Sequence, residues 1–433
     1  MAGDAPRDAA DRTLYAGWAQ ADITPDRPVN LIGQMEKRIA RAARDPLTAT
    51  ALALEARADG ERPVQAILVS CDLLGIPRPA LLRAREALAP LVPGFDVGAL
   101  VLNATHTHTA PGLVESHYTP YDTRGDTGVM QPAEYAELFA GRVARAASEA
   151  WRNRSPSAVG WGLGFASVGT NRRACYASGR AAMYGRTARE DFVGVEGSRD
   201  DAVELLYFWG ADGRLLGVVV NIACTSQETE TLCECSADFW HDTREAVRQR
   251  LGPEVLVLPQ CAAAGDQSPH PIYRARAEEV MQTRRGLTRR QELARRIVSA
   301  VEDVMPLAAA DAKRSLVFRH DAAMLDLPER VPPAPPFIDE DPVHPVAFHV
   351  MRLGDVALAT NPFELYLDYG TRIKARSRAE LTLVVQLACM DCGYLPTERA
   401  ILGGGYSAEQ YLVGPEGGRR LVDETVARIN AMW

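Results

Sequence analysis

The chain has 433 residues, of which 47% are hydrophobic and 24% charged, a mixture that is typical of a folded globular protein and excludes a mainly disordered one. Its net charge of −8 and its lack of a basic stripe argue against nucleic acid as a partner. No apolar run reaches the length of about 18 residues that a membrane span needs, and the N-terminal segment lacks the apolar core of a secretory signal. We therefore expect a cytoplasmic protein without a membrane partner, unless a signal peptide has been removed.

Apolar strands and amphipathic helices alternate along most of the chain, and polar loops follow the strands. Short apolar runs predict the strands, and apolar residues repeating every three or four positions predict the helices. In chain order, these patterns predict a strand at 62–76 with a loop from Cys71-Asp72, a helix at 78–92, a strand at 99–112, a helix at 134–151, a hairpin at 202–227 with Gly213 in its turn, a helix at 236–252 capped by Ser236 or Asp238, a strand and loop at 254–270, a basic helix at 284–305, a hairpin and helix at 346–377, and a strand and loop at 381–397.

This alternation predicts an α/β fold in which the ligand site lies at the C-terminal ends of the strands. The segment 328–345 contains seven prolines, so it can be neither a helix nor a central strand, and we expect an extended connector there. Because this connector does not mark a clear boundary, residues 1–433 are predicted to form one domain.

Two histidines follow one of the predicted strands, in the sequence Thr105-His106-Thr107-His108. In an extended strand, the side chains of His106 and His108 point to the same face. Two imidazoles on one face are a common beginning of a metal site, but they can also be hydrogen-bonded histidines at the end of a sheet. The spacing alone leaves both interpretations open.

Two further polar clusters lie at the ends of predicted elements. Asp238 and His241 are three residues apart at a helix start, so they share one face, unless Asp238 only caps the helix. The loop after the strand near 258 carries Asp266 and Ser268 among small residues, which allow a close approach of the backbone. This loop is either part of a site or a simple turn.

Glu364 and Asp391 each follow a predicted strand, although single loop carboxylates are usually solvated. Together with the histidines, they predict a common site at the strand ends. An alternative is a structural zinc held by cysteines, but a Cys-x-Cys spacing is unusual for such a site, and buried reduced thiols are the simpler interpretation. The cysteines of this alternative are Cys233, Cys235, Cys389 and Cys392.

Four segments of the chain resemble, in the same order, the neutral/alkaline ceramidase superfamily of zinc-dependent amidases. The stretch Asn-Ala-Thr-His-Thr-His-Thr-Ala-Pro-Gly is the most specific of them. The resemblance covers nearly the whole chain and implies a mixed-sheet α/β catalytic domain of the neutral ceramidase type, without that family's C-terminal immunoglobulin-like domain. The four segments are Gly17–Pro25, Ser70–Leu74, Asn103–Gly112 and Gly265–Pro269.

The resemblance also implies roles for individual residues. His106 matches the first zinc ligand of the family, and Glu364 matches its glutamate ligand. His108 matches a histidine that contacts the substrate, which implies a proton donor or a partner of the oxyanion. Ser268 matches the serine of the Gly-Asp-x-Ser-Pro motif, and Asp266 lies beside it in the same motif, so both are implied as catalytic residues.

Two positions depart from the family. Its central histidine ligand falls at Thr225, and its tyrosine ligand falls at Asp391, upstream of Tyr394. We expect Asp391, together with Asp238 and His241, to restore the coordination of one divalent ion. A ligand set of histidine, glutamate and aspartate suits zinc, and also manganese or another divalent ion.

The predicted function is a metal-dependent hydrolase that cleaves an amide or related acyl bond in a soluble, polar small molecule. Arg172 and Arg173 lie where the family has a related Asn-Arg motif, and their guanidinium groups can bind an anionic part of a substrate. The candidate substrate-binding residues are Asp72, Arg172, Arg173, Tyr184 and Tyr394.

Two other functions stay open. A carbohydrate-active hydrolase or lyase on the same scaffold would use the metal to bind hydroxyl groups and aromatic side chains to stack on sugar rings. A binding module that has lost catalysis would explain the altered ligands. The sequence leaves the oligomeric state open, including a homo-oligomer. The candidate stacking residues are Trp18, Tyr184, Trp240 and Tyr394.

Overall fold

The computed structural model of the protein describes residues 11–116, 118–330, 341 and 343–433. Its largest sheet is built from nine strands of these residues, which are β1 (Arg12–Asp22), β4 (Thr48–Arg57), β5 (Val64–Cys71), β6 (Leu100–Ala104), β7 (Ser155–Phe165), β12 (Ala202–Gly210), β13 (Leu215–Ile222), β14 (Leu256–Cys261) and β16 (Ser315–Leu316). The strand order is β14-β13-β12-β7-β1-β4-β5-β6, and β16 pairs with β1. The pairs β5–β6 and β13–β14 are parallel, and the other pairs are antiparallel.

A second mixed sheet has the order β17-β18-β19-β21. Its strands are β17 (Phe318–Leu325), β18 (Val346–Leu353), β19 (Val356–Thr360) and β21 (Leu381–Val385). Smaller sheets lie in the loops. They consist of β2 (Val29–Leu31) with β3 (Arg38–Ala40), β8 (Thr170–Asn171) with β15 (Gln267–Ser268), β20 (Glu364–Leu365) with β22 (Tyr394–Leu395), and β9 (Arg173–Tyr176) between β10 (Ala181–Met183) and β11 (Phe192–Val195).

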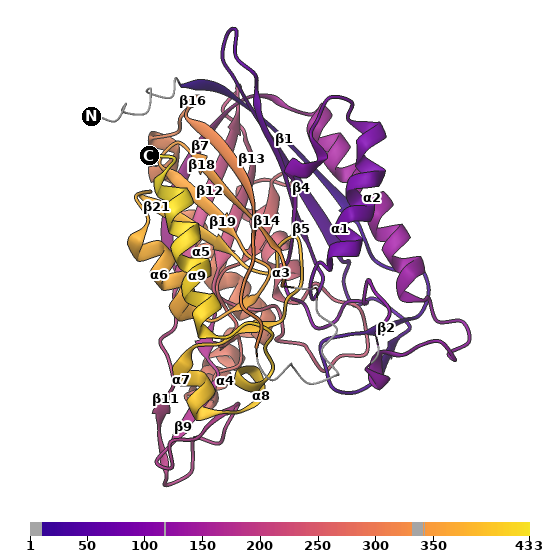
Figure 1. Ribbon diagram of the computed structural model, residues 1–433, viewed down its shortest axis with the longest axis vertical. Helices are drawn as coiled ribbons and strands as arrows, with labels where there is room; N and C mark the ends of the chain where they lie inside the picture. The colour runs from indigo at the N-terminus through magenta and orange to yellow at the C-terminus, as the bar shows by residue number, and fades with distance from the viewer. Residues whose placement is uncertain (1–10, 117, 331–340, 342) are drawn as a thin grey trace.

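Helices cover the outer faces of both sheets. The described helices are α1 (Arg78–Leu88), α2 (Pro132–Arg152), α3 (Phe239–Leu251), α4 (Ala275–Arg285), α5 (Arg289–Ala310), α6 (Leu367–Arg376), α7 (Glu398–Gly403), α8 (Tyr406–Glu409) and α9 (Pro415–Asn430). Helix α2 packs on β1 and β4, α5 packs on β7 and β12, and α9 packs on β18 and β19. Figure 1 shows α1 and α2 on one side of the molecule and α6 and α9 on the other, with the sheets between them.

The large sheet curves so that β14 lies against β5 and β6. The side-chain amide of Asn103 at the end of β6 donates to the carbonyl of Pro259 in β14 at 3.2 Å. The second sheet joins at the same end, because the N–H of Gln386 donates to the carbonyl of Cys261 at 3.0 Å. The C-terminal ends of β6, β14 and β21 therefore meet, which is the predicted place of the ligand site.

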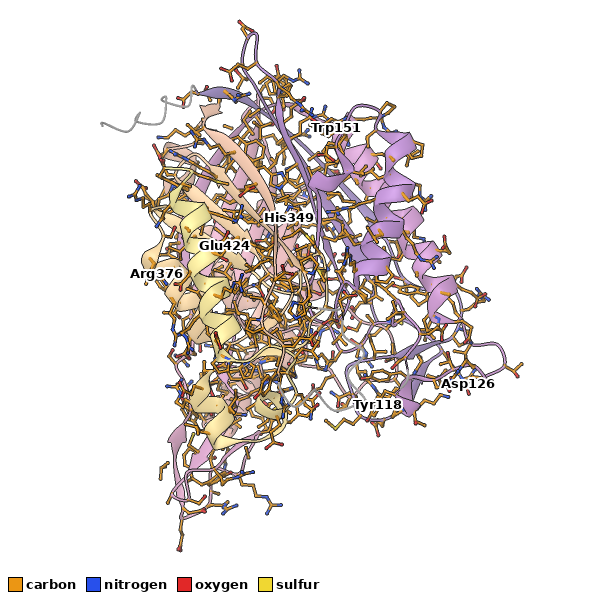
Figure 2. All side chains as sticks on the ribbon, viewed as in Figure 1. Tyr118, Asp126, Trp151, His349, Arg376 and Glu424 are labelled. Atoms are coloured by element: carbon orange, nitrogen blue, oxygen red, sulfur yellow. The ribbon has the colours of Figure 1, made fainter. Side chains whose placement is uncertain are left out.

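The loop that follows the histidine segment folds back over residues 33–38. The hydroxyl of Tyr118 donates to the carbonyl of Met35 at 3.2 Å, and Lys37 forms an ion pair with Asp126. Tyr118 and Asp126 both lie at the lower right of Figure 2, far from Arg376 and Glu424 on the helices of the second sheet. These two contacts hold residues 118–126 against residues 33–38.

The predicted elements are confirmed, with changes at their ends. Strand β6 ends at Ala104, well before residue 112. Helix α3 begins at Phe239, and Asp238 is its N-cap, because the Asp238 carboxylate accepts the N–H of Phe239 at 2.7 Å. Most of the proline-rich segment 328–345 lies outside the described residues. None of the helices in the described part of the chain is long and apolar enough to cross a membrane.

Candidate active site

His106 lies just beyond the end of β6, with a φ of 62° that residues other than glycine seldom adopt. Because β6 ends at Ala104, the prediction that the side chains of His106 and His108 point to one face of a strand does not apply. Instead, the rings of His106 and His108 meet edge to face, with their centroids 4.9 Å apart. The Nδ1–H of His106 donates to the carbonyl of Leu74 at 2.7 Å, which leaves Nε2 available for a ligand.

Glu364, the first residue of β20, faces this Nε2 atom. Its Oε2 lies 3.3 Å from Nε2 of His106. Burial opposes ionisation of both groups, but their mutual attraction raises the pKa of His106 and lowers the pKa of Glu364. Gly265 allows the chain to approach here, because a Cβ on Gly265 would lie 2.3 Å from the carbonyl oxygen of Glu364.

A buried cation and a phenol adjoin this pair. Glu364 and Tyr394 pair in register across β20 and β22. Nη2 of Arg172 donates to the hydroxyl of Tyr394 at 3.1 Å and to the carbonyl of Gly265 at 2.9 Å, and it lies 4.0 Å from Oε2 of Glu364. Burial, followed by the charge of Glu364, holds the pKa of Tyr394 well above its usual value. At neutral pH, the site therefore contains an arginine cation and a protonated phenol.

His108 is buried and neutral. Burial lowers its pKa well below the usual value, and the positive charges of His106 and Arg172 add to this effect. Its Nδ1 lies 3.4 Å from Oε2 of Glu230. Its Nε2 has no hydrogen-bond partner among the described residues. A neutral imidazole with an unsatisfied nitrogen is suited to accept or donate a proton.

The side of His108 away from His106 is lined by a polar network. Gln227 donates from Nε2 to Glu230 at 2.8 Å and to the hydroxyl of Tyr184 at 2.9 Å. The hydroxyl of Tyr184 in turn donates to Oγ of Ser268 at 2.9 Å. Two of the residues predicted from the sequence, Tyr184 and Ser268, therefore lie in the same network as His108.

The residues present fit a divalent ion in part. Zinc takes nitrogen and oxygen ligands at about 2.0–2.2 Å in a tetrahedron, so two of its ligands lie roughly 3.3 Å apart, close to the separation of His106 Nε2 and Glu364 Oε2. The buried Glu364 Oε2 lacks a hydrogen-bond partner among the described residues. However, no three His, Cys, Asp or Glu side chains in the described ranges are grouped as a metal site requires. The described residues therefore offer two donor atoms at a ligand-like separation, without a third donor grouped with them.

Asp391, the predicted further ligand, lies near this pair without joining it. Burial raises its pKa to about 6, the charges of Glu364 and Asp341 add to the rise, and His106 opposes it. The carboxylate of Asp391 lies over Gly75, where a Cβ would be only 2.1 Å from Oδ2.

Of the two residues predicted to replace the missing ligands, Asp238 and His241, the first has its carboxylate engaged by the protein. Oδ1 of Asp238 accepts the N–H of Phe239, and Oδ2 accepts the N–H and the hydroxyl of Thr229, all at 2.7 Å. Asp238 is therefore used as the N-cap of α3, and no metal-ligand group forms around it or His241 in the described chain. Thr225, at the position of the missing histidine, donates its hydroxyl to Gln227.

Asp72 and Asp266, which the sequence analysis assigned to the site, are engaged by protein groups. The carboxylate of Asp72 forms a two-pronged ion pair with Arg244 at 2.8 and 3.0 Å. The carboxylate of Asp266 accepts the side-chain amide of Asn171 at 2.8 Å and the N–H of Leu367 at 3.0 Å. Both residues hold loops together, and neither offers a free oxygen to a substrate.

Arg173 and two tryptophans also have structural roles. Arg173 forms an ion pair with Glu196 at 3.0 Å and donates to the carbonyl of Gly404 at 2.7 Å, so it ties β9 to the loop after α7. Trp18 and Trp240 are buried in the core and cannot stack on a sugar ring. The cysteines of the alternative zinc site form no metal-ligand group in the part of the chain that the structure describes.

Four residues of the site were not predicted from the sequence. They contact His108 or one another. Two of them, Gln227 and Glu230, belong to the sequence Gln-Glu-Thr-Glu, which begins at the end of the segment with the missing histidine and holds two carboxylates and an amide. Glu230 is the central one, because its carboxylate reaches three of the others and His108. The missed residues are Gln34, Gln227, Glu230 and His270.

Comparisons with known proteins identify the fold. No family model matches the sequence, and no curated protein matches it. A ceramidase complexed with C2 superposes with a TM-score of 0.75 at 18% identity, over 98% of this chain and 75% of the ceramidase. The chain has the fold of a neutral ceramidase. The neutral ceramidase from Pseudomonas aeruginosa gives a TM-score of 0.74 at 17% identity, again over 98% of this chain and 75% of the other. These likenesses confirm the predicted mixed-sheet α/β class.

Proposed function

We propose that this chain is a metal-dependent hydrolase that cleaves an amide or related acyl bond in a small polar molecule. The observation that carries the proposal is the facing pair of His106 and Glu364, next to a neutral histidine, on a neutral ceramidase fold. The fold alone does not define a reaction.

His106 and Glu364 would hold the ion, with Asp391 as a further ligand. A divalent ion there would act as a Lewis acid toward the scissile carbonyl and the attacking water. The Nδ1–H bond of His106 to Leu74 supports this role, since a fixed ring that directs Nε2 outward is typical of metal-bound histidine. Oε2 of Glu364 also supports it, because this buried atom has no hydrogen-bond partner among the described residues.

The residues around the pair can move a proton and stabilise charge. Nε2 of His108 can take a proton from the attacking water and return it to the leaving amine, which a neutral imidazole does well near neutral pH. The guanidinium of Arg172 and the hydroxyl of Tyr394 lie beside Glu364. Both can donate to the negative charge that develops on the carbonyl oxygen of the substrate.

The polar lining favours a polar substrate. The side chains of Gln34 and Glu230 lie beside Nδ1 of His108. Gln227 donates to Glu230, and Tyr184 and Ser268 add two hydroxyls. A long acyl chain would have to desolvate these groups without replacing their hydrogen bonds, which is costly. A substrate with hydroxyl, amide or charged groups near the scissile bond could replace these hydrogen bonds and would avoid this cost.

The test is an assay of product release from three substrate classes, each with and without a chelator. The classes are polar N-acyl amines, ceramide in detergent, and glycosides. We expect release of primary amine from at least one polar N-acyl amine, its loss on chelation, and no release of reducing sugar. Release of sugar alone would support the carbohydrate-active alternative. Ceramide cleavage with kcat/KM near 10⁴ M⁻¹s⁻¹, about the lower end for ordinary enzymes, would contradict the polar substrate.

A further inference from the structure

We propose that Arg38 is a positioning residue for His108, because its guanidinium joins the backbone of His108 to two loops that carry neighbouring polar side chains. The inference rests on the proposed function, since His108 is the residue assigned to proton transfer there. It goes beyond that function by adding a residue that neither the motifs of the sequence nor the resemblance to ceramidases assigns.

The guanidinium of Arg38 binds four main-chain carbonyls beside the candidate site. Nη2 donates to the carbonyl of His108 at 2.7 Å and to the carbonyl of Ile32 at 3.0 Å. Nη1 donates to the carbonyl of Leu232 at 3.0 Å and to the carbonyl of Glu230. These carbonyls belong to the turn between β2 and β3, the segment after β6, and the loop between β13 and α3. One planar guanidinium with a rigid set of donors therefore fixes three segments relative to one another.

Arg38 is a costly side chain to bury. It is 2% exposed, and the hydrogen bonds of its guanidinium to described residues all go to carbonyl oxygens and none to a carboxylate. Its Nε has no hydrogen-bond partner among the described residues. A buried charge without a paired anion, and with one N–H unsatisfied, lowers the stability of the fold. Stability alone therefore does not explain this arginine, whereas a defined position of the three segments does.

The two loops that Arg38 holds carry the side chains next to Nδ1 of His108. Nε2 of Gln34 lies 3.4 Å from this nitrogen, and Oε2 of Glu230 lies at the same distance. Nε2 of Gln34 also donates to Oε2 of Glu230 at 2.9 Å, so the two loops contact each other beside the ring. A movement of either loop would therefore change the surroundings of His108.

The first of these loops also packs its backbone against the ring of His108. Gly33 has a φ of 98°, and a Cβ at this position would lie only 2.8 Å from Cγ of His108. The N–H of Gly33 donates to the hydroxyl of Tyr121 at 2.9 Å, which holds the loop from its other side. Because the contact with the ring is so close, the place of the loop determines the place of the ring. A displacement of about 1 Å at a reacting group can lower a rate by about 100-fold.

The experiment compares Arg38→Ala with Arg85→Ala. Arg85 is the matched control, because it also donates to two carbonyls, those of Gly98 and Leu100 at 3.0 Å each. These carbonyls lie at the end of β6 that is opposite to His108. The first readout is hydrogen exchange of the backbone amides in residues 30–36 and 228–234. The second is the separation of kcat from KM, with and without added guanidinium chloride at millimolar concentration.

We expect Arg38→Ala to exchange faster than the unmodified protein in both segments, and its kcat to fall by about 100-fold with KM little changed. Free guanidinium ion should fill the vacated space and restore much of kcat, whereas sodium chloride at the same ionic strength should not. Arg85→Ala should leave the exchange of both segments and kcat nearly unchanged. Unchanged exchange in a folded Arg38→Ala, an unchanged kcat, or a loss of kcat that guanidinium does not reverse would overturn the inference.

The exchange measurement does not depend on turnover, so it separates this inference from the proposed function. If no hydrolase activity is found, exchange still decides whether Arg38 holds the two loops in place. If Arg38→Ala does not fold, Arg38→Lys provides a second test, because an ammonium is a point charge that cannot span four carbonyls. It should speed exchange in at least one of the two segments, and unchanged exchange in both would contradict the inference.

Discussion

Oε2 of Glu364 and Nε2 of His106 face each other across 3.3 Å, although the first follows a strand of the second sheet and the second follows a strand of the large sheet. Such a buried pair is either an ion pair of the folded protein or two ligands of one metal ion. The two alternatives predict different effects of a substitution. An ion pair stabilises the fold only when both charges are present, so removing one charge lowers the free energy of unfolding. Removing a metal ligand instead lowers the metal content.

Replacing Glu364 with glutamine should remove bound metal. The amide keeps the shape but lacks the negative charge that a divalent ion needs from its ligands. Elemental analysis should show about one zinc or manganese per unmodified chain after zinc or manganese is supplied, and much less in Glu364→Gln. Should the variant keep its metal and instead lose about 3–5 kcal/mol of stability, the pair is a structural ion pair.

Replacing His108 with asparagine should separate metal binding from turnover. His108 has no assigned bond to the ion, so the metal content should not change, while kcat should fall by about 100-fold or more because the proton acceptor is lost. His344→Asn is the matched control, since His344 is an exposed histidine in the turn before β18. Equal rates for both variants would exclude His108 from the reaction.

Arg172 and Arg173 should respond differently to the same change. Arg172→Met should lower kcat by about 100-fold or more, because it removes a donor next to the reacting carbonyl. Arg173→Met leaves Glu196 buried without its partner and should lower the free energy of unfolding by about 3–5 kcal/mol, with kcat of the folded protein unchanged. Measurements of kcat and of urea unfolding for both variants test this prediction. A loss of stability in Arg172→Met together with a loss of kcat in Arg173→Met would assign the two arginines the opposite roles.

The motif residues lie at the ends of strands that meet in space. The sequence could therefore predict the centre of the candidate site. His106, His108 and Glu364 come together as expected. The predicted metal role of Asp238 competes with a local one, because an aspartate before a helix can be its N-cap, and the Asp238 carboxylate accepts the N–H of Phe239. Glu230 was missed because its partner His108 lies far away in the sequence.

Part of the fold was also hidden from sequence patterns. Strand β4 reads Thr-Ala-Thr-Ala-Leu-Ala-Leu-Glu-Ala-Arg, and alanine, leucine and glutamate favour helices. It is a strand because it pairs with β1 and β5 and is buried between α2 and β14. Tertiary packing of this kind overrides local propensity and leaves no local signal.

The N-cap role of Asp238 has its own test. Asp238→Ala should lower the free energy of unfolding by about 1–2 kcal/mol, because the first N–H of α3 loses its acceptor. The metal content should not change, and His241→Ala should also keep it. Thermal unfolding measures the stability of each variant, and elemental analysis measures its metal content. Loss of metal in both variants would restore the original prediction that the two residues are ligands.

Stability should fall in mild acid because of the buried His349 near the centre of the molecule (Figure 2). Burial, with the charge of His320, lowers its pKa from 6.5 to about 3. Between these values the unfolded chain binds a proton at this residue that the folded chain does not, so stability falls as the pH falls from 6.5 toward 3, by about 1.4 kcal/mol for each pH unit. Urea unfolding at pH 7 and pH 5 should show a smaller pH effect in His349→Gln than in His344→Gln. Equal effects would contradict this assignment.

The central claim is that a divalent ion at His106 and Glu364 enables amide hydrolysis. The most direct measurement is amine release from a polar N-acyl substrate by one protein sample, before chelation, after removal of divalent ions, and after their return. We expect release to stop on removal and to return with about one equivalent of zinc or manganese per chain, and not to return in His106→Ala. Full release by the ion-free protein would contradict the account.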